Sequence, residues 1–216
     1  MSAQCCGLPP PPGTDADATS DERYRRVLWV VLGINAAMFL VEIIAGLVAG
    51  SASLQADALD FLADAANYGI GLFVVGMALR YRATAALAKG IGMGLFGIWV
   101  LGIAAWQTLA GAVPEAPVMG VIGVMALAAN AVCLGLLWRF RAGDANRRSL
   151  WICSRNDVLG NVAVLLAALG VFGTGTGWPD VIVAVVMAGL ALSGAWQVIG
   201  QARAELRVVA GAVAAE

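Results

Sequence analysis

The chain has 216 residues, of which 61% are hydrophobic and 12% are charged, and its mean hydropathy is +0.84. Soluble domains are about 45–50% apolar and about 25% charged, so this composition excludes an ordinary soluble enzyme, a disordered chain and a collagen-like chain. The net charge of −1 offers no basic surface to nucleic acid, and the chain has no histidine. Four cysteines are too few for a disulfide scaffold. The sequence therefore predicts an all-α membrane protein with several spans.

Six runs of the sequence are long and apolar enough to cross a bilayer, which takes about 20 residues of helix. The third, fourth and sixth runs carry no charge, whereas the other three contain charged residues. We expect these spans at residues 27–49, 53–79, 90–113, 116–138, 150–173 and 181–200. They divide the chain into a flexible cytoplasmic tail (1–26), a six-helix transmembrane domain (27–200) and a short cytoplasmic tail (201–216).

The basic residues indicate the direction of the spans. All of them except Arg155 lie in the two tails, between spans two and three, or between spans four and five. The other three connections carry none. Because cytoplasmic loops carry an excess of Lys and Arg, both termini are expected in the cytoplasm. A miscounted span would break this alternation, so the pattern also supports six spans.

Acidic residues fall inside the expected spans, where charge is expensive. They are Glu42, Asp57, Asp60, Asp64 and Asp157. A charge in hydrocarbon costs roughly 2.5–3.5 kcal/mol on insertion scales, and acids inside spans are functional-site candidates by default. The spans hold a single basic residue, so protons, water or a bound cation must relieve most of this cost.

The spacing of the polar residues places them on two helix faces. In span two, a polar stripe steps by four, three and four residues and so occupies one face; it consists of Ser53, Asp57, Asp60 and Asp64. In span five, Cys153, Asp157 and Asn161 are four residues apart and form a second stripe. Carboxylates with one thiolate suit Zn²⁺ or a similar transition metal, whereas Mg²⁺ and Ca²⁺ prefer more oxygens and no sulfur. The two stripes therefore predict a metal site between spans two and five.

Protons are expected to compete with metal for these carboxyl groups. Without metal, neighbouring carboxylates in a poorly solvated place repel one another, so some should hold protons near neutral pH. A metal needs them deprotonated, so metal entry releases protons. This competition is a sufficient basis for exchanging metal against protons. Asp57, Glu42 and Asn161 are assigned weaker roles, in the pathway or in a proton relay.

At these residues the chain resembles the cation diffusion facilitator family of metal/proton antiporters. In the family's span-two signature, a His or Asp and an Asp four residues later bind metal, and those positions fall on Asp60 and Asp64. Cys153 and Asp157 align with a His-x-x-x-Asp motif in span five. The resemblance covers about residues 27–200. Further matches are Asn35, Glu42, Gly46, Asp144, Asn146 and Ser149.

The resemblance implies a non-enzymatic secondary transporter that exports divalent transition metals from the cytoplasm in exchange for protons. Zn²⁺ is the first expected substrate, with Cd²⁺ or Co²⁺ next, and no prosthetic group is expected. The implied metal ligands are Asp60, Asp64, Asp157 and Cys153. The expected location is a bacterial inner membrane, and the expected assembly is a homodimer formed through membrane helices, whose glycines would allow close packing.

Three features depart from the family pattern. Cys153 stands where the family has a histidine, a His-rich cytoplasmic loop is absent, and no cytoplasmic metal-binding domain is expected after span six. Two alternatives therefore stay open: a proton-coupled exporter of organic cations, and a non-transporting membrane partner or metal sensor on the same fold. Cys133 in span four is expected to be a packing residue, and no role is assigned to Cys5 or Cys6.

Overall fold

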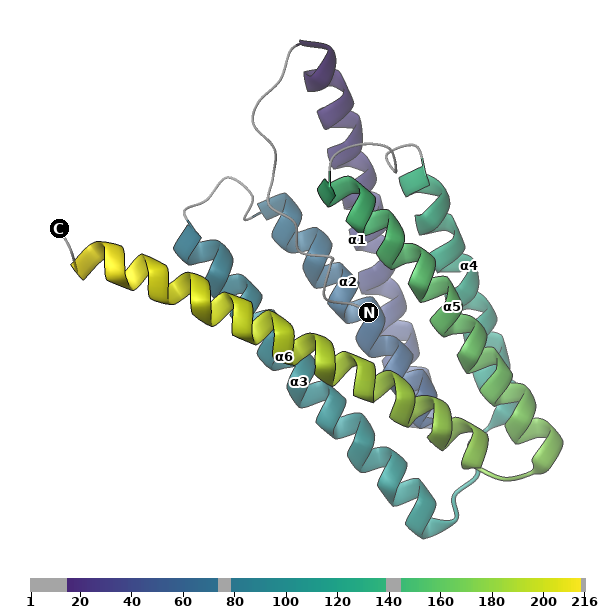
Figure 1. Cartoon of the computed structure of the whole chain (residues 1–216). Coiled ribbons are helices and arrows are strands. Elements are labelled where there is room, and N and C mark those ends of the chain that lie inside the picture. The colour runs from purple at the N-terminus through teal and green to yellow at the C-terminus, as the bar shows by residue number, and fades with distance from the viewer. Residues whose placement is uncertain (1–14, 74–78, 139–144, 215–216) are drawn as a thin grey trace.

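The structure is a computed structural model that describes residues 15–73, 79–138 and 145–214. Side chains are described for most of these residues, but not for 15–21, 79, 82, 145–156 and 208–214. The described residues form α1 (Asp15–Ala49), α2 (Ala52–Phe73), α3 (Leu79–Ala110), α4 (Ala116–Leu137), α5 (Ala145–Thr174) and α6 (Trp178–Ala214). The predicted all-α architecture is confirmed (Figure 1).

Three helices extend well beyond the expected spans. One is α3, which begins at Leu79, the residue expected to end span two, whereas α2 ends at Phe73. α1 begins at Asp15, inside the segment expected to be a flexible tail, and α6 continues to Ala214. Acidic residues near the start of α1 favour a helix N-terminus. Glu22 also pairs with Arg26 one turn later, at 3.8 Å. The described part of the expected tail, residues 15–26, is therefore helical.

Among the described residues, five helices are long and apolar enough to cross a membrane. Their spans are Glu22–Ala49, Ala83–Ala110, Ala116–Leu137, Asp157–Thr174 and Trp178–Arg207. The predicted multi-pass membrane protein is confirmed. α2 also has the length of a span, at 22 residues, but it carries three aspartates. Every residue from 52 to 59 is buried, so neighbouring helices rather than lipid surround this part of α2.

α2 lies inside the bundle, in contact with α1, α3, α5 and α6. The strongest pairings are α3 with α6, α1 with α2, and α4 with α5 (Figure 1). The helices converge at the end where α1 meets α2, α3 meets α4 and α5 meets α6, and we call this the convergent end. At the opposite end, the splayed end, the α3–α6 pair spreads away from α1, α4 and α5. The start of α1 and the end of α6 both lie at the splayed end.

The three turns at the convergent end each contain a glycine with left-handed backbone geometry. Gly50, Gly111 and Gly175 have φ angles of 62°, 63° and 64°, which other residues adopt only with strain. The Gln107 side chain donates to the Gly50 carbonyl. The backbone N–H before α4 donates to the last carbonyl of α1 at 3.0 Å. These bonds join the tips of α1, α3 and α4.

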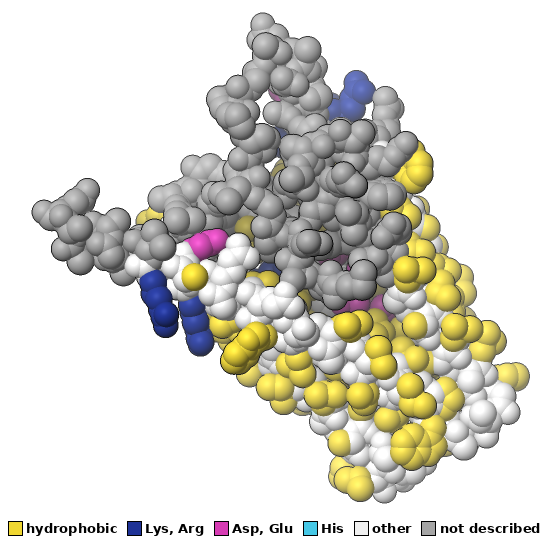
Figure 2. Space-filling model, viewed as in Figure 1, with side chains coloured by type: hydrophobic (Ala, Val, Ile, Leu, Met, Phe, Trp, Pro, Cys, Tyr) yellow, Lys and Arg dark blue, Asp and Glu magenta, His cyan; other side chains and the backbone are white. Residues whose placement is uncertain are grey.

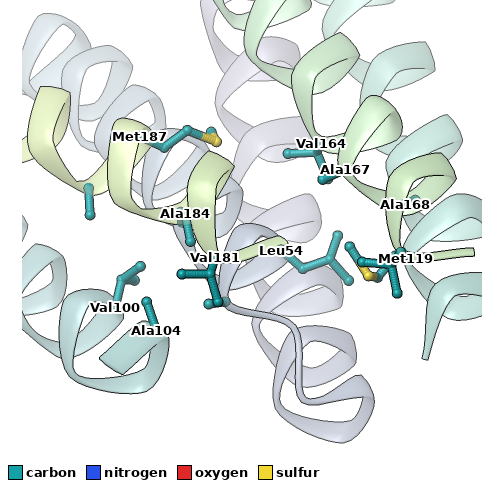
Figure 3. Packing of buried hydrophobic residues seen from close by; sticks show 14 residues of the cluster. Leu54, Val100, Ala104, Met119, Val164, Ala167, Ala168, Val181, Ala184 and Met187 are labelled. Atoms are coloured by element: carbon teal, nitrogen blue, oxygen red, sulfur yellow. The ribbon is translucent and has the colours of Figure 1, made fainter. Parts of the chain in front are cut away.

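The largest buried apolar cluster also lies toward the convergent end. It joins the first turns of α2, α4 and α6 to the second halves of α3 and α5, and Figure 3 shows Leu54, Val100, Met119, Val164 and Ala184 among its members. A second cluster, in the splayed half, joins α1, α2 and α4 around Tyr68 and Cys133. In the face seen in Figure 2, apolar side chains are spread over the convergent half, and the basic side chains that are described lie toward the splayed end.

Candidate metal-binding site

α2 and α5 lie side by side and bring three of the predicted site residues together. The carboxyl groups of Asp64 on α2 and Asp157 on α5 come within hydrogen-bonding range of each other. Asp60 lies one turn along α2, close enough to act electrostatically on both. Its Oδ2 is 3.9 Å from the position that a Cβ would take at Gly160 of α5. We call Asp60, Asp64 and Asp157 the three-carboxyl group.

The members of the three-carboxyl group differ in exposure and in hydrogen bonding. Asp64 is 8% exposed, whereas Asp60 and Asp157 are partly exposed. The Tyr68 hydroxyl donates to Asp64 Oδ2 at 3.4 Å. Asp157 Oδ2 is buried and accepts no hydrogen bond from any described residue. Because carboxylates this close repel unless protons or a cation lie between them, the arrangement can bind a cation or share protons.

Asp57 pairs with Glu42, and it is also close enough to act electrostatically on Asp60 and Asp157. It lies one turn nearer the convergent end, and its carboxyl group is within hydrogen-bonding range of Glu42 on α1. Both residues are buried. Among the described residues, nothing donates to either oxygen of Glu42 or to Oδ2 of Asp57. A second carboxyl pair therefore lies between the three-carboxyl group and the convergent end.

Of the remaining predicted residues of span five, Asn161 has a described side chain and Cys153 does not. Asn161 donates from Nδ2 to the Asp157 carbonyl at 2.8 Å, and its buried Oδ1 has no partner among the described residues. The side chains of Cys153 and Arg155 lie outside the described residues. Within the described part of the chain, no three Cys, Asp or Glu side chains already have the arrangement of a metal site. Ligation by the three-carboxyl group would therefore need side-chain movement, a further ligand, or both.

Ser53 belongs to the predicted polar stripe, but the structure gives it a different partner. Its Oγ donates to Asp180 Oδ1 of α6 at 2.5 Å, and the Ser51 hydroxyl donates to the same oxygen at 2.7 Å. The backbone N–H groups of Ala52 and Ser53 add bonds of 2.8 and 3.1 Å to the Asp180 carboxylate. Asp180 therefore caps the N-terminus of α2 from another helix. This contact lies outside the candidate site.

Two residues beside the site were not predicted to be there. Lys89, expected in the connection between spans two and three, lies in α3 and donates to the Asn67 side chain of α2. Its ammonium group is also close enough to act electrostatically on Asp64. Asn67 follows Asp64 by three residues, so extending the stripe in span two by one more step would have found it.

Cys133 of α4 also lies close to the site. It is buried and receives a hydrogen bond from Asn35 of α1, with the nitrogen 3.7 Å from the sulfur. It packs in the same cluster as Tyr68 and lies within electrostatic reach of Asp64 and Asp157. The signal in the sequence is Asn130, which is three residues earlier and therefore on the same helix face.

Comparison with known proteins gives consistent matches. The sequence profile of the cation efflux transmembrane domain matches residues 28–206. The zinc transporter ZitB of Escherichia coli (strain K12) is 28% identical over 210 residues, which cover 89% of this chain and 66% of that protein. ZitB of Yersinia pestis is 26% identical over 205 residues, covering 87% and 64% of the two chains.

A similar match is the metal cation efflux system protein CzcD of Cupriavidus metallidurans, 25% identical over 183 residues that cover 79% of this chain and 58% of that protein. The chain thus spans between 58% and 66% of the length of these relatives, less than two thirds of each. The profile match includes the whole three-carboxyl group and most of the bundle. The chain belongs to the cation efflux, or cation diffusion facilitator, family of membrane transporters.

Proposed function

We propose that this protein exports a divalent transition-metal cation from the cytoplasm in exchange for protons. The observation that carries the proposal is the meeting of Asp64 and Asp157, from two helices, beside Asp60 inside a membrane bundle. The relatives named as zinc and metal cation transporters support the class of substrate. Zn²⁺ is therefore the first candidate, with Cd²⁺ or Co²⁺ next.

The proposed ligands are Asp60, Asp64 and Asp157, with Cys153 as the fourth. Oxygen and sulfur donors in this number suit a tetrahedral Zn²⁺. Their mutual repulsion is relieved either by protons or by the metal, so each displaces the other. Because the site holds either metal or protons, the outward flux of metal is coupled to the inward flux of protons, provided that the site opens to one side at a time.

The shape of the bundle supports entry of metal at the splayed end. There the α3–α6 pair stands apart from α1, α4 and α5, while the large apolar cluster and the Asp180 cap close the convergent end. We assign the splayed end to the cytoplasm, because the basic connections lie there. A second packing, closed at the splayed end and open at the convergent end, would release the metal outside.

Glu42 and Asp57 are assigned to proton transfer rather than to metal ligation. They lie between the three-carboxyl group and the convergent end, which is the side from which protons would enter. Their buried oxygens without donors among the described residues are suited to holding and passing a proton. Asn161 is assigned to the pathway beside Asp157. The homodimer expected from the family resemblance stays a prediction.

The test is proton flux in proteoliposomes that contain a pH-sensitive dye, challenged in turn with Zn²⁺, Cd²⁺, Co²⁺, Mn²⁺ and an organic cation. Asp157→Asn removes the charge at nearly constant size. Glu115→Gln is the matched control, since Glu115 is an exposed acid at the convergent end whose side chain makes no capping bond. Metal-driven flux in the wild type and in Glu115→Gln, but not in Asp157→Asn, is the expected result.

The other outcomes would each contradict part of the proposal. Flux driven only by the organic cation would replace the metal exporter with an organic-cation exporter. Metal binding without flux would indicate a non-transporting partner or sensor. Unchanged metal-driven flux in Asp157→Asn would overturn the assignment of the site.

A further inference from the structure

Exposed arginines lie at the splayed end of the α3–α6 pair. Arg80 is in the first turn of α3, and Arg203 and Arg207 are near the end of α6. All three side chains are exposed, and none of them forms an ion pair with another described residue. Figure 2 shows basic side chains projecting beside the end of α6. The proposed metal site uses none of these charges.

The packing of α3 against α6 brings arginines of both helices to a similar level. The two helices touch at Gly90, where an added Cβ would lie 2.8 Å from Cγ1 of Ile199. At a rise of about 1.5 Å per residue, Arg80 lies about 15 Å beyond Gly90 toward the splayed end. Arg207 lies about 12 Å beyond Ile199 in the same direction. Arg80 and Arg207 are therefore within one helical turn of the same level.

These arginines continue helix faces that are exposed and apolar. On α6, Trp196 is 80% exposed and precedes Arg203 by seven residues, so both lie on one face. On α3, the exposed side chains of Ile91 and Leu95 follow Arg80 at helical spacing. In a membrane, exposed apolar faces contact acyl chains. Each of the two lipid-facing surfaces therefore ends in arginine at the splayed end.

The length of α6 places its arginines among lipid headgroups. The span Trp178–Arg207 has 30 residues, or about 45 Å of helix, which matches a bilayer with its headgroup regions. The exposed rings of Trp178 and Trp196 are about 27 Å apart along the helix, close to the thickness of the hydrocarbon core. Tryptophans are typical of its two borders. Arg203 lies about 10 Å beyond Trp196, outside the hydrocarbon.

We propose that Arg80, Arg203 and Arg207 bind the phosphate groups of anionic phospholipids in the leaflet at the splayed end. A guanidinium group offers two parallel N–H donors to phosphate oxygens. An anionic headgroup is preferred to a zwitterionic one, because it brings no cation of its own to oppose the arginines. The exposed apolar faces beneath the arginines hold the acyl chains of the same lipid. The inference concerns a lipid partner and does not depend on the proposed metal transport.

The test is native mass spectrometry of the full chain in detergent, titrated with phosphatidylglycerol or with phosphatidylcholine that has the same acyl chains. We expect the wild type to bind phosphatidylglycerol at least about tenfold more tightly, since each basic residue near an anionic headgroup contributes about fivefold. The triple variant Arg80→Gln, Arg203→Gln and Arg207→Gln should bind both lipids alike. Equal binding of the two lipids by the wild type, or an unchanged preference in the triple variant, would overturn the proposal.

The matched control lies on α1, at the same end of the bundle. Arg23, Arg25 and Arg26 are also exposed, but acidic residues accompany them, and Arg26 pairs with Glu22 at 3.8 Å. Changing these three arginines to glutamine removes the same charge as the α3–α6 variant does. This control should keep the wild-type preference for phosphatidylglycerol. A loss as large as in the α3–α6 variant would show that the preference follows net charge, and the site would be refuted.

Two further measurements complete the test. Inorganic phosphate carries the charge without acyl chains, so an excess of it should leave phosphatidylglycerol bound; displacement of the lipid would make this a phosphate site instead. If the triple variant does not fold, the single variant Arg203→Gln decides. It should weaken binding of phosphatidylglycerol about fivefold and leave binding of phosphatidylcholine unchanged. Unchanged binding of both lipids would count against the proposal.

Discussion

Ser53 at the start of α2 donates a 2.5 Å hydrogen bond to Asp180 at the start of α6. With the Ser51 hydroxyl and two backbone N–H groups, this carboxylate accepts four bonds in a fully buried place. A carboxylate at a helix N-terminus is also stabilised by the helix dipole. The convergent end of α2 is therefore fixed to α6.

The first prediction concerns this contact. In the wild type, two hydroxyls and two backbone N–H groups donate to the two oxygens of Asp180. Asp180→Asn replaces one of these oxygens with an NH₂ group, which cannot accept a hydrogen bond. We expect the free energy of unfolding to fall by about 1–3 kcal/mol, visible as a lower melting temperature of the detergent-solubilised protein. Glu115→Gln, at the same end of the bundle, should melt like the wild type. Equal melting temperatures for Asp180→Asn and the wild type would contradict the capping role.

The second prediction separates protons from metal. Glu42→Gln keeps the shape of the side chain but removes a titrating carboxyl that faces Asp57. We expect metal affinity close to that of the wild type and a smaller number of protons moved per metal ion. Isothermal titration and the proteoliposome assay measure the two quantities. A loss of metal binding as large as that in Asp157→Asn would instead make Glu42 a ligand.

The third prediction is the pH dependence of metal affinity. As pH falls, more of the three-carboxyl group holds protons, which the metal must displace, so the apparent affinity falls with pH. The slope of log K against pH counts the displaced protons. Titrations at several pH values should therefore give a smaller slope for Asp157→Asn than for the wild type. A slope of zero in the wild type would exclude competition between metal and protons.

The fourth prediction concerns Lys89, whose ammonium group bonds to Asn67 and acts on Asp64. A positive charge here opposes a second cation in the site. Lys89→Gln should raise metal affinity about fivefold, equivalent to about 1 kcal/mol of repulsion. Lys89→Arg keeps the charge and should behave like the wild type. If both variants bind metal equally well, the charge of Lys89 has no part in setting the affinity.

Much of the site could be predicted because helical periodicity makes neighbours of residues three and four apart. That rule placed Asp60 and Asp64 on one face, and the rarity of acids in spans marked Asp157 as their partner. The same rule put Ser53 on this face as well, although its hydroxyl bonds to Asp180 and not to the site. A shared face does not show which neighbouring helix covers each turn, and the first turn of α2 meets α6 instead.

Contacts between distant residues could not be predicted from one sequence. Asn35 and Cys133 are 98 positions apart, and only the packing of α1 against α4 brings them together. The extension of α1 back to Asp15 was missed for a different reason: span length was judged by the apolar core of a bilayer, whereas helices can continue into water.

The polarity of α2 has a consequence for how the protein is made. Each of its three aspartates would cost roughly 2.5–3.5 kcal/mol in lipid, so α2 is a poor candidate to leave the translocon as a solitary helix. A nascent α2 is better retained until α1, an apolar neighbour already synthesised, can shield it. Its own cap, Asp180, is translated more than a hundred residues later. The first turn of α2 therefore lacks this cap until α6 has been made and packs against it.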